Sequence, residues 1–168
     1  NTNVQFDPRK FTWLGSPSSY GDDAYMLWVR KDAAVKTIED ALKPGGPPLI
    51  LGGTAEGSTG NDIPILMRDT IGLNVKVISG YPDASRTVLA MEREEVDGLC
   101  QTYSSLRTQH PTWIKDGTVN VIAVLALQRN AELPNAPAAI EFAKNDEQKA
   151  ILKVVLGPDF AGGPLVAP

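Results

Sequence analysis

Cysteine and histidine are almost absent from this 168-residue sequence, which contains one of each, Cys100 and His110. A lone cysteine cannot form a disulfide within the chain, so the cysteine content does not indicate an oxidising or a reducing compartment. Cys100 and His110 could in principle act as a nucleophile and its base, but no feature of the sequence brings them together. A lone buried cysteine is more often a packing residue, and we expect a protein that is not an enzyme.

Basic clusters and long apolar runs are also missing. The chain has 16 lysine and arginine residues against 20 aspartate and glutamate residues, and a net charge of -4. Without a basic run it lacks the positive surface that binds a nucleic-acid backbone, so we expect no nucleic-acid partner. No apolar stretch approaches the roughly 20 residues that span a bilayer, so we expect no direct membrane insertion. The first residues, NTNVQFDPRK, have no apolar signal core, so any export signal would be removed or lie outside this sequence.

What the sequence does contain is an alternation of strand and helix patterns, with an apolar fraction of 42% that is enough for one buried core. Apolar runs predict strands at 11–15, 24–30, 48–51, 74–79, 98–100 and 119–127, and in the tail GGPLVAP. Helical spacing and capping patterns predict helices after Thr37, over 61–71, after Asp83 and from Asn145. This order favours an α/β fold with a largely parallel sheet flanked by helices.

Ligands of such sheets bind beyond the carboxyl ends of the strands. The loops that matter are therefore those after Leu51, Ser79, Cys100 and Leu127, namely GGTAEGSTG, GYPD, QTYSS and QRN. Their glycine, hydroxyl and amide groups suit hydrogen bonding to a small polar ligand better than proton transfer or metal ligation. We expect Gln101 to contact the ligand, and among the aromatic residues Tyr81 and Tyr103.

The first of these loops, within LILGGTAEGSTGNDIP, exposes bare backbone between a strand and a helix. Its N–H groups and the partial positive charge of the helix N-terminus could hold a carboxylate or phosphate. The loop is neither a Walker loop, because the lysine is missing, nor a GxGxxG loop. Alternatively, the glycines only satisfy turn geometry and Thr59 or Asn61 caps the helix. Because Glu56 would repel a bound anion, we expect its carboxylate to face solvent or a cationic part of the ligand.

Asp22 and Asp23 are the adjacent carboxylates that could bind a metal ion. Two neighbouring carboxylates after SSYG usually only hydrate a turn. We therefore expect no metal site and no cofactor.

Nearly the whole chain resembles the Bug-type receptors, the extracytoplasmic solute-binding proteins of tripartite tricarboxylate transporters. No single stretch is highly specific, and the resemblance lies in the order and spacing of FDPRKFTWLGS, VRKDAAVKTIEDAL, GGTAEGSTGND, VKVISGYPDASRTVLAMEREEVDGLC and LPNAPAAIEFAKNDEQKAILKVVLGPDFAGGPLVAP. The family fold is a periplasmic-binding-protein-like (type II) pair of α/β lobes joined by crossing strands, with the ligand in the cleft between them.

The resemblance implies that this chain is a fragment, the second lobe with parts of the hinge. Residues 1–23 would be an entry strand from the missing first lobe, 24–157 the ligand-binding lobe, and 158–168 the return segment. It also implies a periplasmic location, a small organic acid as the solute, and membrane transporter subunits as partners.

By the same resemblance, two loops supply the ligand contacts of this lobe, namely Thr54, Ala55, Ser58 and Thr59 in one and Tyr81, Pro82 and Asp83 in the other. The sequence departs from the family at Asp62, where many members have histidine, and at ISGYPD, where many have VPYKG. These departures remove positive character, so the solute is expected to differ from the simple dicarboxylates and tricarboxylates of the family.

Two other function classes stay open on the sequence. A sensory effector domain of a transcriptional regulator uses a related two-lobed fold, and its reading frame would include a DNA-binding helix-turn-helix. An enzyme that uses the glycine-rich loop for a phosphorylated substrate is disfavoured by the missing lysine and the sparse acid and base candidates.

Overall fold

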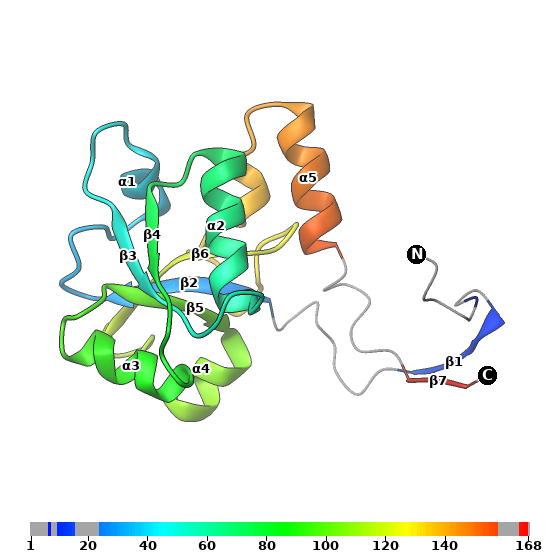
Figure 1. Ribbon diagram of the computed structural model, residues 1–168, viewed down its shortest axis with the longest axis horizontal. Helices are drawn as coiled ribbons and strands as arrows, with labels where there is room; N and C mark the ends of the chain where they lie inside the picture. The colour runs from blue at the N-terminus through cyan, green and yellow to red at the C-terminus, as the bar shows by residue number, and fades with distance from the viewer. Residues whose placement is uncertain (1–6, 8–9, 16–23, 158–164, 168) are drawn as a thin grey trace.

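The computed structural model describes residues 7, 10–15, 24–157 and 165–167, and its main body is a five-stranded sheet with helices on both faces (Figure 1). The strand order is β4-β3-β5-β2-β6. The strands are β2 (Tyr25–Arg30), β3 (Leu49–Gly52), β4 (Val75–Ile78), β5 (Gly98–Thr102) and β6 (Val119–Val124). The helices are α1 (Ile38–Leu42), α2 (Thr59–Ile71), α3 (Ala84–Glu92), α4 (Tyr103–Gln109) and α5 (Asp146–Leu156), with a 3₁₀ turn, η2, at Ala139–Phe142.

The sheet is mixed in direction. Strand β3 runs parallel to β4 and β5, whereas β2 runs antiparallel to both β5 and β6. Four strands therefore point the same way, as the sequence predicts, and β2 opposes them. The reversal of β2 was not predicted, because a central strand that is buried on both faces has the same apolar pattern in either direction.

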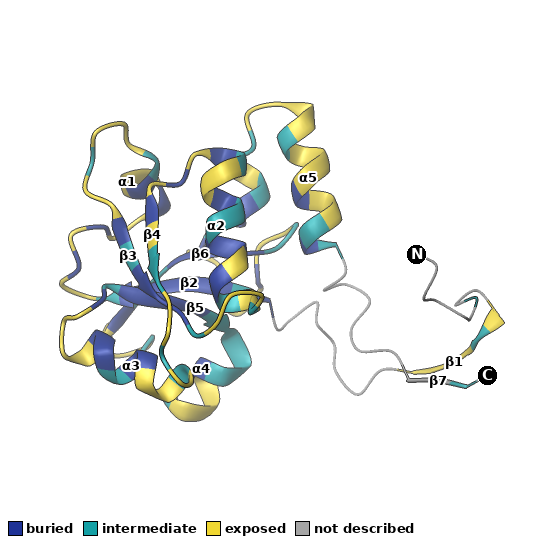
Figure 2. Ribbon diagram, viewed as in Figure 1, coloured by how far each residue is buried: buried dark blue, intermediate teal, exposed yellow. Residues whose placement is uncertain are grey.

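Strand β2 is the centre of the core and divides its side chains between the two faces of the sheet. Leu27 and Val29 pack in the cluster that includes residues of α1, α2 and α5. Met26 and Trp28 pack in the cluster that includes residues of α3 and α4. All four side chains are fully buried, and Figure 2 shows the middle of β2 buried. This alternation fixes which helices cover each face.

Helix ends form where the sequence predicts them. Thr37 Oγ1 accepts a hydrogen bond from the Asp40 N–H at 3.1 Å, and the Asp40 carboxylate accepts one from the Thr37 N–H at 3.1 Å. Hydrogen bonds from the Lys36 N–H, and from the side chain and N–H of Thr37, lower the pKa of Asp40. Asn145 Oδ1 accepts from the Gln148 N–H at 2.8 Å, and Gly72 ends α2 in the left-handed conformation. The predicted capping patterns at both helix starts are confirmed.

The two ends of the chain form a separate two-stranded sheet. β1 (Thr12–Gly15) pairs antiparallel with β7 (Leu165–Ala167), so the predicted first and last strands are confirmed. The assignment of 1–23 and 158–168 to a hinge stays a prediction. The candidate metal-binding pair Asp22 and Asp23 lies outside the described residues.

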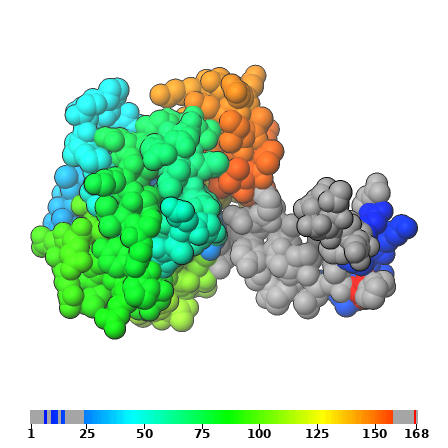
Figure 3. All heavy atoms as spheres, viewed as in Figure 1, coloured from blue at the N-terminus to red at the C-terminus, as the bar shows by residue number. Residues whose placement is uncertain are grey.

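Helix α5 completes the layer over one face of the sheet. Its buried Leu152 and Leu156 belong to the same cluster as Met67 and Ile71 of α2. Figure 3 shows the orange atoms of α5 against the green atoms of α2. The last helix therefore packs over the same part of the core as α2.

An ion pair closes the irregular segment between β6 and α5. Arg129 donates through Nε and Nη2 to the two carboxylate oxygens of Glu141, at 2.8 and 2.7 Å, and the Ala138 N–H donates to Glu141 Oε1 at 2.8 Å. These donors lower the pKa of Glu141 from 4.5 to about 2.

The Glu141 carboxylate is expected to make stability depend on pH in the acid range. Because its folded pKa lies below the unfolded value of 4.5, its contribution is complete above pH 4.5 and is lost as the pH falls toward about 2. The pair is solvent-exposed, so the contribution is less than about 1 kcal/mol. Urea unfolding between pH 6 and pH 2.5 should show a smaller loss of stability in Glu141→Gln than in the unchanged chain. Equal losses in the two proteins would contradict this.

Candidate ligand-binding site

A hollow of about 230 Å³ lies at the carboxyl ends of the neighbouring parallel strands β3 and β5. The antiparallel β2 begins at the same edge, because Tyr25 pairs with Thr102. The lining residues come from these strand ends and from the starts of α2, α3 and α4: Tyr25, Gly52, Gly53, Thr54, Ser58, Thr59, Gly60, Ala84, Thr87, Leu99, Cys100, Gln101, Thr102 and Ser105.

Two buried glycines at the end of β3 let α2 and α3 pack closely beside this hollow. A Cβ at Gly52 would overlap the methyl group of Thr87, and a Cβ at Gly53 would overlap the Asn61 side chain. Both positions therefore need glycine for close packing against α3 and α2. The Gly53 backbone is itself paired, since its N–H donates to the Ile78 carbonyl at 2.9 Å and its carbonyl accepts from the Tyr81 N–H at 3.2 Å.

The first turn of α2 presents backbone donors to the hollow. Ser58 is the N-cap residue, but its hydroxyl donates to the Ala55 carbonyl at 2.7 Å and makes no capping bond. Within the described residues, no acceptor pairs with the N–H groups of Thr59 and Gly60. A 13-residue helix with an uncapped N-terminus concentrates partial positive charge at this point.

Neither Thr59 nor Asn61, which the alternative reading of this loop assigns to the cap of α2, caps the helix. Thr59 is the first residue of the helix, and Asn61 is buried, with its Nδ2 donating to Ser79 Oγ at 2.6 Å. Asn61 therefore ties the start of α2 to the end of β4. This tertiary contact to Ser79 replaces a local capping bond by the Asn61 side chain.

The other two helices that begin at the hollow are capped by their own side chains. The Asp83 carboxylate accepts from the Arg86 N–H at 2.8 Å, as predicted for the start of α3. Thr102 Oγ1 accepts from the Ser105 N–H at 3.3 Å at the start of α4. All three helices still direct their positive dipole ends to this edge of the sheet, and α2 is the one of these three without a side-chain cap.

Cys100 lies in the wall of the hollow, and its thiol is not activated as a nucleophile. Burial raises the pKa of its thiol, so the thiolate that a nucleophile requires does not form near neutral pH. His110 stacks on Trp113 with ring centroids 3.7 Å apart. The pair weighed as nucleophile and base therefore has no catalytic arrangement in the structure.

Four of the predicted ligand contacts line the hollow, namely Thr54, Ser58, Thr59 and Gln101. The other five predicted contacts do not line it. Ala55 and Pro82 are exposed outside the hollow, and Asp83 caps α3. Tyr81 packs against the core cluster that includes residues of α3, and the Tyr103 hydroxyl donates to Glu132. Glu56 is exposed, as expected, and the exposed Asp62 accepts a hydrogen bond from the Gly57 N–H at 3.2 Å.

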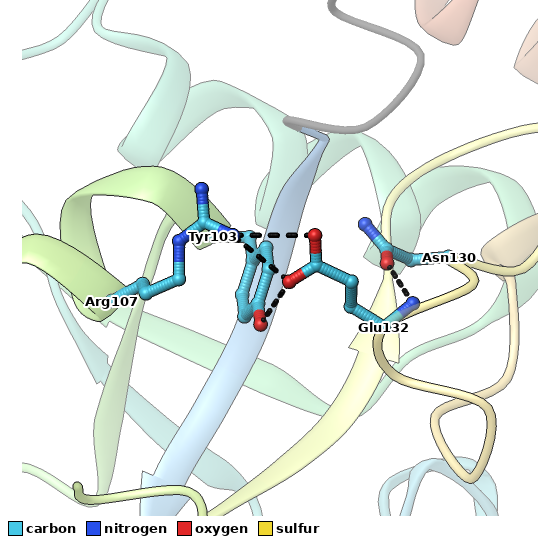
Figure 4. Close-up of polar contacts among 4 residues, drawn as sticks. All are labelled: Tyr103, Arg107, Asn130 and Glu132. Carbon is cyan, nitrogen blue, oxygen red and sulfur yellow. Dashed lines mark hydrogen bonds and ion pairs between the residues drawn. The ribbon is translucent and has the colours of Figure 1, made fainter. Parts of the chain in front are cut away.

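Tyr103 contacts the segment after β6 instead of the hollow (Figure 4). Its hydroxyl donates to Glu132 Oε2 at 2.8 Å, and Arg107 donates to the same oxygen at 2.9 Å. The Glu132 N–H donates to Asn130 Oδ1 at 2.8 Å, which closes the turn. Through Glu132, these bonds hold the segment after β6 to α4. The predicted QRN loop, residues 128–130, does not line the hollow. The hydrogen bond from the Tyr103 hydroxyl and the charge of Arg107 lower the pKa of the Glu132 carboxyl.

Sequence reasoning did not name seven lining residues that carry side chains as ligand contacts: Tyr25, Ala84, Thr87, Leu99, Cys100, Thr102 and Ser105. A signal for Ala84 and Thr87 was available, because they follow the predicted capping residue Asp83 and the first turn of a helix at this edge faces the hollow. Tyr25 had no such signal, because it reaches the hollow through the reversed direction of β2.

Metal-ligating clusters and membrane-spanning helices are both absent from the described residues. No cluster of three histidine, cysteine, aspartate or glutamate side chains occurs there that could hold a metal ion. Among the helices described, none has the length and apolar character needed to cross a membrane.

Solved structures of solute-binding proteins share this fold. A TctC solute-binding protein from Polaromonas is 16% identical, with a TM-score of 0.64 over 98% of this chain and 64% of its own. The periplasmic binding protein BugD is 20% identical, with a TM-score of 0.56 over 82% of this chain and 51% of its own. Rpa4515 from R. palustris with adipate is 19% identical, with a TM-score of 0.57 over 90% of this chain and 55% of its own.

These likenesses establish the fold class: a mixed α/β sheet flanked by helices, of the periplasmic-binding-protein-like kind. The chain spans between 51% and 64% of the length of these three structures. No family model matches the sequence, and no curated protein matches it.

Proposed function

We propose that this chain is the ligand-binding lobe of an extracytoplasmic solute receptor that captures a small carboxylate-bearing solute. The observation that carries the proposal is the hollow at the ends of β3 and β5, where the N–H groups of Thr59 and Gly60 have no acceptor in the described part of the chain. A carboxylate placed there would accept both hydrogen bonds and neutralise the positive end of α2.

The hydroxyl groups around these donors suit the same ligand. The Thr54 hydroxyl donates a hydrogen bond to Ser58 Oγ at 3.1 Å, and this bond fixes the loop beside the N-terminus of α2. Thr59 is exposed and can donate its hydroxyl to the ligand. The site is therefore built for hydrogen bonding and contains no group suited to bond-making chemistry, in keeping with capture of an unaltered solute.

The proposal extends to the longer protein of which this lobe would be part. In that protein a second lobe would contact the other side of the solute, and a ligand that binds the closed form more tightly would shift the equilibrium toward closure. The structural neighbours are binding proteins by name, and one of them is described with adipate. By likeness to them we propose a periplasmic location and delivery to a transporter of the tripartite tricarboxylate type.

A thermal-shift screen of the longer protein against carboxylates tests the proposal. A ligand at 100 times its dissociation constant should add about 2.7 kcal/mol of stability. Ser58→Ala should reduce the shift, whereas Thr108→Val, an exposed change on α4 outside the lining, should leave it unchanged. A folded protein that responds to no carboxylate, or an equal effect of both substitutions, would contradict capture at this hollow.

A further inference from the structure

The hollow proposed to hold the solute has no charged side chain in its lining. The residues that form it are glycines, alanine, hydroxyl residues, one glutamine, one leucine, one tyrosine and the buried Cys100. Building on the proposed function, we infer that the part of the solute held by this lobe carries a single carboxylate and an otherwise uncharged body. The lobe thereby selects a monocarboxylate over a dicarboxylate of the same length.

A second carboxylate has no positive partner here. The segments 52–62, 79–87 and 99–105 that bound the hollow carry three acidic residues, Glu56, Asp62 and Asp83. Arg86 is the basic residue on these segments, and it is exposed and outside the lining. A dianion would therefore leave one charge unpaired among like charges, and this raises its free energy in the site.

The backbone donors at α2 suffice for one carboxylate. The N–H groups of Thr59 and Gly60 are two donors at one helix end, which matches the two oxygens of one carboxylate. At the start of α4, the Tyr103 N–H already donates to the Ala24 carbonyl and the Ser105 N–H to Thr102 Oγ1. At the start of α3, the capping Asp83 carboxylate places a negative charge beside the first-turn N–H groups and disfavours a second anion there.

The rest of the lining suits an uncharged body. Leu99 and Cys100 are buried, and Tyr25 and Ala84 are half-buried, so they offer apolar surface to the ligand. The Gln101 amide has no hydrogen-bond partner among the described side chains and could bind a hydroxyl or carbonyl group of the ligand. Burial of a charged group against this wall would lose hydration without a compensating ion pair.

Butyrate and succinate form a matched pair for the test, since both have four carbons and they differ in the second carboxylate. Each is titrated at pH 7 into the isotopically labelled 168-residue chain, and the backbone amide resonances are followed by NMR. Butyrate is expected to shift the signals of Thr59, Gly60 and Cys100 and to bind about 5-fold or more tightly than succinate.

Gln101→Lys supplies the reciprocal test by placing a cation in the wall. The substitution is expected to raise the affinity for succinate about 5-fold or more and to change the affinity for butyrate by less. Exposed Gln109→Lys on α4, outside the lining, adds the same charge and controls for a general electrostatic effect.

The outcomes separate this inference from the proposed function. Butyrate preference with reversal by Gln101→Lys supports the inference. Succinate binding as tightly as butyrate at the same resonances overturns the inference alone and leaves carboxylate capture standing. No shift with either acid, in a chain shown by its spectrum to be folded, overturns both.

Discussion

Ser58→Asp is expected to stabilise the fold and, at the same time, to weaken binding of the carboxylate on the order of 100-fold. Ser58 occupies the N-cap position of α2 but makes no capping bond. An aspartate there would accept from the free first-turn N–H groups and complement the helix dipole, which adds about 1 kcal/mol of stability. It would also place a negative charge where the solute carboxylate is proposed to bind. Urea unfolding measures the first effect, and calorimetry on the longer protein measures the second.

Ser58→Asn is the matched control, because asparagine caps the same N–H groups without a charge. It should give a similar gain in stability with a much smaller loss of affinity. The difference between the two variants isolates the repulsion between the aspartate and the bound anion. Retained affinity in Ser58→Asp would show that the solute binds away from the α2 N-terminus.

Gly98→Ala is expected to cost about 3 kcal/mol or more of the free energy of unfolding. Gly98 lies opposite Val29 where β5 pairs with β2. A Cβ at Gly98 would overlap the carbonyl oxygen of Trp28 and lie 2.7 Å from Val29 Cα. Both neighbours are backbone atoms at the centre of the sheet, so they cannot move without separating two strands. A loss of this size is a large part of the roughly 5–15 kcal/mol that a typical domain has, and urea unfolding measures it.

Gly117→Ala controls for the loss of glycine itself. Gly117 has a positive φ of 66°, and a Cβ added to it would meet no atom within 4 Å, so its replacement meets backbone strain alone. This costs about 1 kcal/mol. Similar losses at Gly98 and Gly117 would mean that β5 can shift to accommodate a side chain and that the contact with β2 is not rigid.

Local sequence signals were enough to place the helices and strands. The Thr37 and Asp40 pair starts α1, Gly72 ends α2, and Asn145 with Gln148 starts α5. These signals depend on backbone hydrogen bonds within a few residues, so they do not need the rest of the fold. The glycine-rich loop was located in the same way, between a buried strand and a helix.

The candidate site was only partly predictable. Thr54, Ser58 and Thr59 lie together in the sequence and line the hollow, and Gln101 follows from the rule that loops at the carboxyl ends of strands face a ligand. Tyr103 was misplaced by that rule. It lies at the correct edge of the sheet, but its hydroxyl pairs with Glu132, 29 residues further along the chain.

The sequence by itself determined the α/β character, the order of the elements and the position of the glycine-rich loop, because spacing, capping and glycine act over short range. Only the tertiary structure decided the reversed direction of β2, the approach of Tyr25 to the hollow and the pairing of Tyr103 with Glu132. Each of these depends on contacts between segments distant in the chain. For such contacts, several segments offer an apolar strand or a polar side chain equally suitable partners. Packing of the whole lobe selects among them.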